Sequence, residues 1–139
     1  MQKRPSPGIS VILIKKNTIL LGLRNGSHGD NTWGMPGGHI EWRESFRECA
    51  KREIKEELGV IISCDSKPFY VTNDYFKKED KHYITVFIVA EIKEGIIQNK
   101  EPDKCSEWKW FNYAKLPKNL FLPVENLIKQ KELKVLFIK

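Results

Sequence analysis

The chain has 139 residues, of which 40% are hydrophobic and 30% are charged, and its formal net charge is +6. This length predicts one domain, covering residues 1–139, with a sizeable core. No stretch is apolar for long enough to cross a bilayer, and the opening MQKRPSPGIS lacks the layout of a signal peptide. We therefore expect a cytoplasmic protein with no membrane partner.

Cysteine usage and charge add two weaker expectations. Cys49, Cys64 and Cys105 are widely spaced and form no CxxC pair, which indicates reduced, mostly buried thiols and neither a disulfide framework nor a zinc site. The lysines are scattered along the chain, so the positive charge favours a phosphorylated small ligand only weakly. We expect no stable nucleic-acid partner.

The first half of the chain predicts strands, a loop and a helix. Residues 7–26 hold two apolar runs around Lys16 and Asn17, a pattern typical of a β-hairpin. Residues 27–39, SHGDNTWGMPGGH, are rich in Gly, Asn and Asp and predict a loop. The apolar period then changes to four, which predicts a helix whose core-facing stripe is Phe46, Ala50, Ile54 and Leu58.

Capping signals mark both ends of this helix. Ser45 followed by Glu48 fits the capping box, in which each residue satisfies a free backbone N–H of the first turn. Gly59 stands where a helix end favours a residue in the left-handed conformation.

The second half predicts more strands and one further helix. Residues 60–64, 67–76 and 81–92 are rich in β-branched and aromatic side chains, and the charged turn KKED separates the last two runs. Residues 93–106 read as a loop, and residues 107–114 alternate as a strand does. Residues 116–133 contain proline-marked turns and then a helix. The fold class we predict is a single α/β domain with a mixed sheet and two principal helices.

An acidic stripe shares the first helix with its apolar stripe. Glu53, Glu56 and Glu57 fall within about 100° of the helix circumference, although neighbouring carboxylates repel. One interpretation is a solvated face that Lys51 and Lys55 partly neutralise. The other is a site for a divalent cation.

A cation site needs a facing surface, and the preceding loop supplies one. Mg²⁺ prefers oxygen ligands and commonly bridges a few carboxylates to substrate phosphates. Gly37 and Gly38 have no side chain, so their backbone can approach a ligand closely and offer a carbonyl oxygen.

Residues 38–60, GHIEWRESFRECAKREIKEELGV, resemble the Nudix box. TWGMPGG at residues 32–38 is similar to the family's usual approach to the box. Arg43 stands where many relatives have Gly, at a variable position. All nine specified positions match: Gly38, Glu44, Arg52, Glu53, Ile54, Glu56, Glu57, Gly59 and Val60.

The resemblance implies a fold, a reaction and a cofactor. The fold is a mixed β-sheet sandwiched between α-helices, and the reaction is Mg²⁺- or Mn²⁺-dependent hydrolysis of a diphosphate linkage. Residues 73–92 and 101–121 are similar to MutT-type members, which implies nucleoside or deoxynucleoside triphosphates, 8-oxo-dGTP among them, as substrates. Another nucleoside-diphosphate-X substrate (a nucleotide sugar, a dinucleoside polyphosphate, capped RNA or an isoprenyl diphosphate) and a non-catalytic binding module are the alternatives. A homodimer is expected by analogy.

The resemblance also implies residue roles. Glu53, Glu56 and Glu57 would bind metal together with the carbonyl of Gly37 or Gly38. One of the three glutamates, with Glu53 favoured, or a distal acid would accept the proton from water. Arg52 and Glu44 would complete the catalytic set, Arg52 by orienting a glutamate through an ion pair and Glu44 as its second partner.

Several further residues are candidates with two interpretations each. Glu101 is either a further metal ligand or a solvated loop acid, and Arg24 holds a phosphate or lies at the surface. For Trp108 and Trp110 there are two interpretations. At least one of the rings packs in the core, or the rings stack beneath a base. His28, His39 and His82 make no metal set, and each either touches substrate or has a structural role. Phe121 and Leu122 belong to the segment 120–123, which resembles a pocket segment where several relatives have Trp in place of Leu122.

Overall fold

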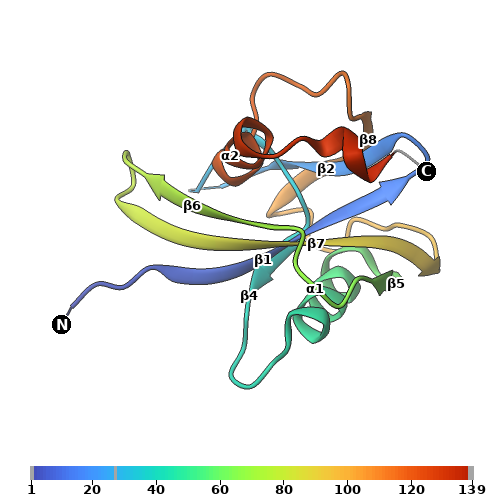
Figure 1. Cartoon of the computed structure of the whole chain (residues 1–139), viewed down its shortest axis with the longest axis horizontal. Coiled ribbons are helices and arrows are strands. Elements are labelled where there is room, and N and C mark those ends of the chain that lie inside the picture. Colours follow the sequence, from blue (N-terminus) through green and yellow to red (C-terminus); the bar gives the residue numbers. More distant parts are fainter. Residues whose placement is uncertain (1, 27, 138–139) are drawn as a thin grey trace.

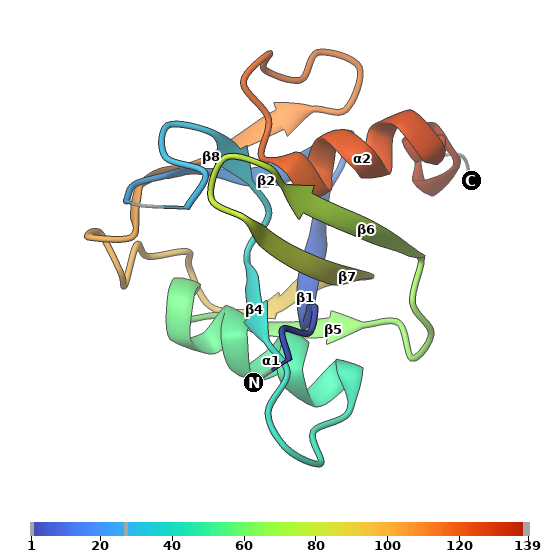
Figure 2. The same ribbon diagram turned by 90° about the vertical axis from the view of Figure 1, so that its left-hand side faces the viewer.

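Two helices lie on opposite sides of a group of central strands (Figures 1 and 2). The computed structural model describes residues 2–26 and 28–137, and its helices are α1 (Phe46–Leu58) and α2 (Leu122–Gln130). This arrangement confirms the predicted α/β class, with a mixed sheet between helices.

The central sheet is built on two parallel strands. β1 (Ser6–Lys15) runs parallel to β7 (Lys81–Glu94), and β4 (Gly37–His39) pairs antiparallel with β1. β7 is long enough to pair with two strands on its other edge, β6 (Tyr70–Phe76) on its first half and β5 (Ile61–Cys64) on its second half. The sheet is therefore mixed, as predicted.

A second group of strands is built on β2, and its members β2 and β8 lie above the central sheet, on the α2 side (Figure 1). β2 (Thr18–Arg24) pairs antiparallel with β8 (Cys105–Asn112) and with the short β3 (Trp33–Gly34). The β1–β2 hairpin joins the two groups, and Lys16 at its turn has a φ of 56°. The hairpin prediction is thus confirmed.

The prediction of an uninterrupted loop over residues 27–39 is wrong. This segment contains β3 and β4, because its glycine-rich backbone runs along the edges of β2 and β1 and completes their hydrogen bonding. Gly37 and Gly38 pair with Ser10 and Ile9, and no alternating side-chain pattern marks so short a strand.

The central strands separate two apolar clusters. The first, between the sheet and α1, contains Ile9, Val11, Ile54, Leu58 and Ile88 among others. The second lies on the α2 side and includes Ile12, Leu21, Phe87, Val124 and Leu127. A 3₁₀ helix, Leu133–Leu136, follows α2 and packs on the second cluster.

The helix α1 keeps its predicted caps but not its whole predicted stripe. Ser45 and Glu48 form the capping box, and Gly59 ends the helix at a φ of 72°. Ala50, Ile54 and Leu58 are buried, whereas Phe46 is 38% exposed. Phe46 is the first residue of the helix, where the chain has not yet reached the sheet, and Cys49 occupies the buried position of the first turn.

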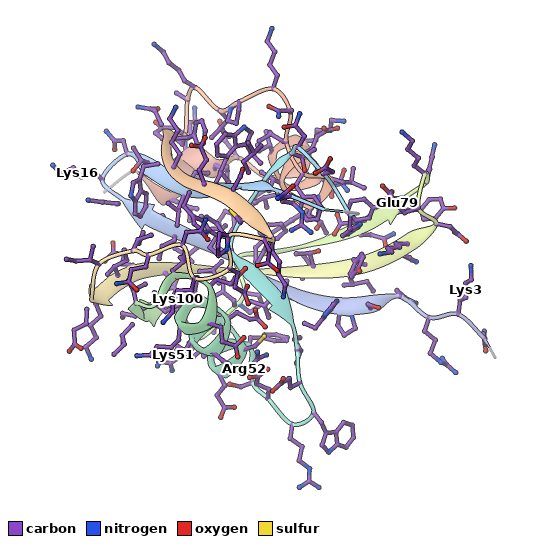
Figure 3. All side chains as sticks on the ribbon, turned by 180° about the vertical axis from the view of Figure 1, so that it is seen from behind. Lys3, Lys16, Lys51, Arg52, Glu79 and Lys100 are labelled. Carbon is purple, nitrogen blue, oxygen red and sulfur yellow. The ribbon has the colours of Figure 1, made fainter. Side chains whose placement is uncertain are left out.

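The predictions about membrane helices, cysteines and lysines can also be compared with the structure. Within the described residues, no helix combines the length and apolar character needed to cross a membrane. All three cysteines are free, Cys49 and Cys105 buried and Cys64 partly so, as predicted. Lys3, Lys16 and Lys100 lie on well-separated parts of the molecule, which fits the scattered charge read from the sequence (Figure 3).

Candidate active site

A cavity of about 600 Å³ opens between α1, the strand pair β1–β4 and the segment before β8. Its lining residues fall into two groups. One end is acidic, with side chains from α1 facing the glycines of β4. The other end is aromatic, with rings from β6, β7 and the segment before α2. The two groups include Glu53, Glu56, Glu57, Gly37 and Gly38 at the first end and His28, Phe76, Tyr83 and Phe121 at the second.

Arg52 links the glutamates of the acidic end. Its guanidinium donates to both carboxylate oxygens of Glu44, at 2.6 and 2.9 Å, and to Glu53 Oε1 at 2.8 Å. It also donates to the backbone carbonyl of His39 at 3.0 Å and lies 3.4 Å from Glu56. In Figure 3 Arg52 projects from α1 beside the chain that leads from β4. One arginine thus ties the helix to that chain, and the predicted pairing of Arg52 with Glu44 is present.

The glycines of β4 are required by close approaches. A Cβ on Gly38 would lie 2.4 Å from the carboxylate of Glu53, and one on Gly37 would lie 2.0 Å from the carbonyl oxygen of Ile9. The Gly37 N–H donates to Glu57 Oε1 at 2.8 Å. The backbone of β4 therefore meets the carboxylates of α1 through an N–H, while the carbonyl ligand expected from Gly37 or Gly38 stays a prediction.

Burial and neighbouring charges give the acids of this end very different pKa values. Burial, together with the charges of Glu53 and Glu101, raises the pKa of Glu57 to about 8. Burial likewise raises the pKa of Glu53, although its bond to Arg52 opposes the change. Glu44 is the reverse case, because hydrogen bonds from Arg52 lower its pKa to about 2. Negative charge is thus least favourable at Glu53 and Glu57, where a bound cation would stabilise it most.

The chemistry of these donors fits a hard divalent cation. Glu53, Glu56 and Glu57 supply carboxylate oxygens to one cavity, and a positive charge there would offset the burial and repulsion that raise the pKa of Glu57. In the described part of the chain, however, no three acidic, histidine or cysteine side chains are gathered tightly enough to surround an ion. Glu53 and Glu56 face Arg52 while Glu57 faces the Gly37 N–H. Glu56 is the most exposed of the three, so its side chain is the least restricted by neighbours.

The aromatic end is a cluster of four rings. The imidazole of His28 lies 4.1 Å from Phe76, 5.2 Å from Tyr83 and 5.4 Å from Phe121. The guanidinium carbon of Arg24 stands 3.9 Å above the ring of Phe121, and Arg24 Nε donates to the backbone carbonyl of His28. Arg24 ends β2 beside the glycine-rich segment, as predicted, and its guanidinium contacts a backbone carbonyl and an aromatic face.

Burial keeps the histidine of the aromatic end uncharged. It lowers the pKa of His28 to about 4, with the positive charges of Arg24 and Lys81 adding to the effect, so the imidazole is neutral at pH 7. His28 Nδ1 and Trp108 Nε1 are buried and have no hydrogen-bond partner among the described residues. Both residues line the cavity.

The other predicted site residues differ in whether they line the cavity. Glu101 and Trp108 line the cavity, and both Trp108 and Trp110 are partly buried and pack against the first apolar cluster. Leu122 is absent from the cavity wall formed by the described residues, because it begins α2 and Phe121 and Pro123 face the cavity in its place. His39 lines the cavity, whereas His82 is exposed and bonds Asn73.

Phe76, Tyr83 and Thr85 are among the lining residues that were not predicted from the sequence. They lie on strands β6 and β7, where aromatic and β-branched side chains are expected for packing alone. One signal was present: Thr72, Asp74 and Phe76 alternate along β6, so a polar pair shares the inward face with an aromatic ring.

Comparison with known proteins places the chain in a family. The family model described as the NUDIX domain matches residues 4–130. The chain is 30% identical to an ADP-ribose pyrophosphatase of Methanocaldococcus jannaschii over 118 residues, which cover 84% of this chain and 68% of that protein. It is 25% identical to an oxidized purine nucleoside triphosphate hydrolase of Danio rerio, over 77% of this chain and 66% of that protein.

A solved structure agrees with these matches. A MutT NUDIX hydrolase from Burkholderia pseudomallei superposes with a TM-score of 0.82 and 25% identity, covering 93% of this chain and all of that one. The chain belongs to the NUDIX domain family. It is a Nudix pyrophosphohydrolase, which acts on a nucleoside diphosphate joined to another group.

Proposed function

We propose that this enzyme hydrolyses nucleoside or deoxynucleoside triphosphates, 8-oxo-dGTP among them, to a nucleoside monophosphate and pyrophosphate. The observation that carries the proposal is the pairing of an acidic end and an aromatic end within one cavity. Aromatic faces hold bases well, and carboxylates that bind a divalent cation can hold phosphates. The Danio rerio relative, named for oxidised purine triphosphates, supports the same substrate class.

Mg²⁺, or Mn²⁺ in its place, is the cofactor we assign to the acidic end. Glu53, Glu56 and Glu57 would hold it with the carbonyl of Gly37 or Gly38, and Glu101, which also lines the cavity, is a further candidate. When bound, such an ion offsets the charge of the phosphates and of the leaving oxygen. This is the chemistry that a triphosphate, which repels an attacking hydroxide, most needs.

The chain's own residues divide the remaining work. Arg52 and Glu44 are positioning residues, because Arg52 fixes Glu53 and is itself fixed by two bonds to Glu44. A carboxylate of the helix accepts the proton from water, with Glu53 as the favoured group. Glu57 competes for this role, since a pKa of about 8 lies near the working pH of a general base. Arg24 and Phe121 would hold the nucleotide from the other end.

A second substrate has a specific observation in its favour. The Methanocaldococcus jannaschii relative is named an ADP-ribose pyrophosphatase and is 30% identical. ADP-ribose is a nucleoside diphosphate joined to a sugar, so the acidic end would treat it as it treats a triphosphate. The difference would lie in how the rest of the cavity receives the second ribose.

A product analysis separates the two. The purified chain is incubated with Mg²⁺ and a panel of nucleoside triphosphates, 8-oxo-dGTP and ADP-ribose, and products are resolved by chromatography. Triphosphate cleavage to monophosphate and pyrophosphate, with kcat/KM above that for ADP-ribose, is the expected result. Release of orthophosphate alone, turnover without a divalent cation, or a clear preference for ADP-ribose would contradict the proposal.

A further inference from the structure

A buried carboxylate lies behind the aromatic end of the cavity. Asp74 of β6 is fully buried, and its Oδ2 accepts hydrogen bonds from the hydroxyls of Thr72 at 3.0 Å and Thr85 at 2.6 Å. Its Oδ1 accepts from the side-chain amide of Asn126, on α2, at 2.9 Å. Three donors satisfy this carboxylate, and of its partners Thr85 is the one that lines the cavity.

Strand register places Thr85 beside the aromatic rings. Thr85 pairs with Thr72, and Tyr83 pairs with Asp74, across the antiparallel β6–β7 ladder. Residues two apart on a strand share a face, so Tyr83 and Thr85 point the same way, with Phe76 on the same face of β6. Thr85 therefore lies on the wall of the cavity, on the same strand face as the rings of the aromatic end.

The contact with Asp74 fixes the polarity of this hydroxyl. An ionised carboxylate only accepts hydrogen bonds, so the single O–H of Thr85 points at Asp74. The oxygen of Thr85 then has only lone pairs left for the cavity. A ligand that meets Thr85 must bring a donor, because a second acceptor would face it unpaired.

We propose that Thr85 recognises the base of the substrate by accepting a hydrogen bond from a ring N–H, with Asp74 as the positioning residue that sets its polarity. The inference rests on the proposed function, since it requires a nucleobase at the aromatic end. The ligand class is a heterocycle with an N–H on the edge that faces Thr85, such as the N1–H of a 6-oxopurine.

The test compares two monophosphates that differ at this edge. Inosine 5′-monophosphate carries an N1–H, whereas purine riboside 5′-monophosphate has an unprotonated N1 at the same place. Binding is measured by calorimetry on the whole chain. The wild type is expected to bind the inosine compound more tightly by about tenfold, the cost of leaving one buried polar group unpaired. Equal affinity of the wild type for both compounds would overturn the inference.

Thr85→Val and Thr85→Ser form the first matched pair of variants. Valine keeps the shape and removes the acceptor, so the two monophosphates should bind within about twofold of each other. Serine keeps the hydroxyl and should restore the preference. A Thr85→Val variant that weakens both compounds equally, with the preference intact, would assign Thr85 to packing and contradict the inference.

Asp74→Asn gives a second, independent readout. Asn126 must still donate to the oxygen of the new side chain, so the amide nitrogen is turned toward Thr72 and Thr85. The Thr85 hydroxyl then accepts from that nitrogen and is free to donate to the cavity. The preference should reverse in favour of purine riboside monophosphate. Circular dichroism verifies the fold, and an unchanged preference in a folded variant would refute the positioning role of Asp74.

The two proposals fail in different ways. If no nucleotide is hydrolysed by the wild type in the product analysis, the proposed function fails whatever Thr85 does. If triphosphates are hydrolysed but the two monophosphates respond identically to Thr85→Val, only the assignment of Thr85 fails.

Discussion

The two ends of the cavity hold their polar groups in different ways. At the acidic end, carboxylates are crowded together and their pKa values diverge, from about 2 for Glu44 to about 8 for Glu57. At the aromatic end, the polar groups are few, and a neutral imidazole and a hydroxyl of fixed polarity stand among rings. The acidic end is suited to binding a cation and transferring protons. The aromatic end is suited to distinguishing one ligand from another by its shape.

The largest effect should come from the acidic end. Glu56→Gln removes a charge from the metal-binding set while keeping the side chain's size. We expect kcat to fall by roughly 1,000-fold, about 4 kcal/mol of transition-state stabilisation, with little change in thermal unfolding. Steady-state kinetics with saturating Mg²⁺ measures it. Glu125→Gln, an exposed acid on α2, is the matched control and should retain full activity. Near-normal turnover in Glu56→Gln would reduce the acidic stripe to a solvated surface.

Arg52→Lys should have the next largest effect. Lysine keeps the charge but cannot span both oxygens of Glu44, the carbonyl of His39 and Glu53 at once. We expect kcat to fall by about 10- to 100-fold, as it does when a group that orients metal ligands is lost. Arg47→Lys, on the exposed face of the same helix, should change nothing. If both variants behave alike, Arg52 has no positioning role.

Much of the acidic end could be predicted from the sequence, because its residues lie close together in the chain. The helix period places Glu53, Glu56 and Glu57 on one stripe, and the capping box and Gly59 mark the helix ends. The helix period could not show from which donor each of these glutamates accepts its hydrogen bonds. Arg52 takes two of the glutamates and the Gly37 N–H takes the third, which depends on the packing of β4 against α1.

The aromatic end could not be predicted in the same way. It joins residues from β2, β6, β7 and the segment before α2, and no local period relates them. Phe76 and Tyr83 read as ordinary strand residues. Of the two residues predicted from the segment 120–123, Phe121 lines the cavity, whereas Leu122 begins α2 and is not among the described lining residues. The Asp74 network needs the register of three elements at once.

A smaller effect on stability tests the electrostatics of the acidic end. The pKa of Glu57 is raised in the folded protein, so between pH 4.5 and about 8 the folded chain keeps a proton that the unfolded chain has lost. Stability should therefore fall as the pH rises through that window. Glu57→Gln removes this loss and keeps the bond from the Gly37 N–H, so it should be more stable than the wild type at pH 8 by about 1–2 kcal/mol.

Thermal unfolding in EDTA, from pH 5 to pH 9, measures this difference. The gap between Glu57→Gln and the wild type should widen as the pH rises, while turnover by the variant should be largely lost. A gap that is constant with pH would show that Glu57 titrates normally.

The smallest effect should come from His28, at the aromatic end. Its pKa is lowered in the folded state, so between pH 6.5 and about 4 the unfolded chain binds a proton that the folded chain does not. Stability should decline as the pH falls through this window. Unfolding midpoints of the wild type and His28→Gln, measured from pH 7 to pH 4, should converge as the pH falls. Parallel profiles would mean that His28 is exposed to solvent and titrates freely.

If the carboxylates of α1 hold a divalent cation, the chain should take up Mn²⁺ and Mg²⁺. Calorimetric titration with both ions, in the presence and absence of a non-hydrolysable nucleotide, measures this uptake. We expect uptake by the wild type that is strongly weakened in Glu56→Gln and Glu57→Gln and unchanged in Glu125→Gln. Absence of uptake by the wild type under both conditions, or equal uptake by all four proteins, would contradict it.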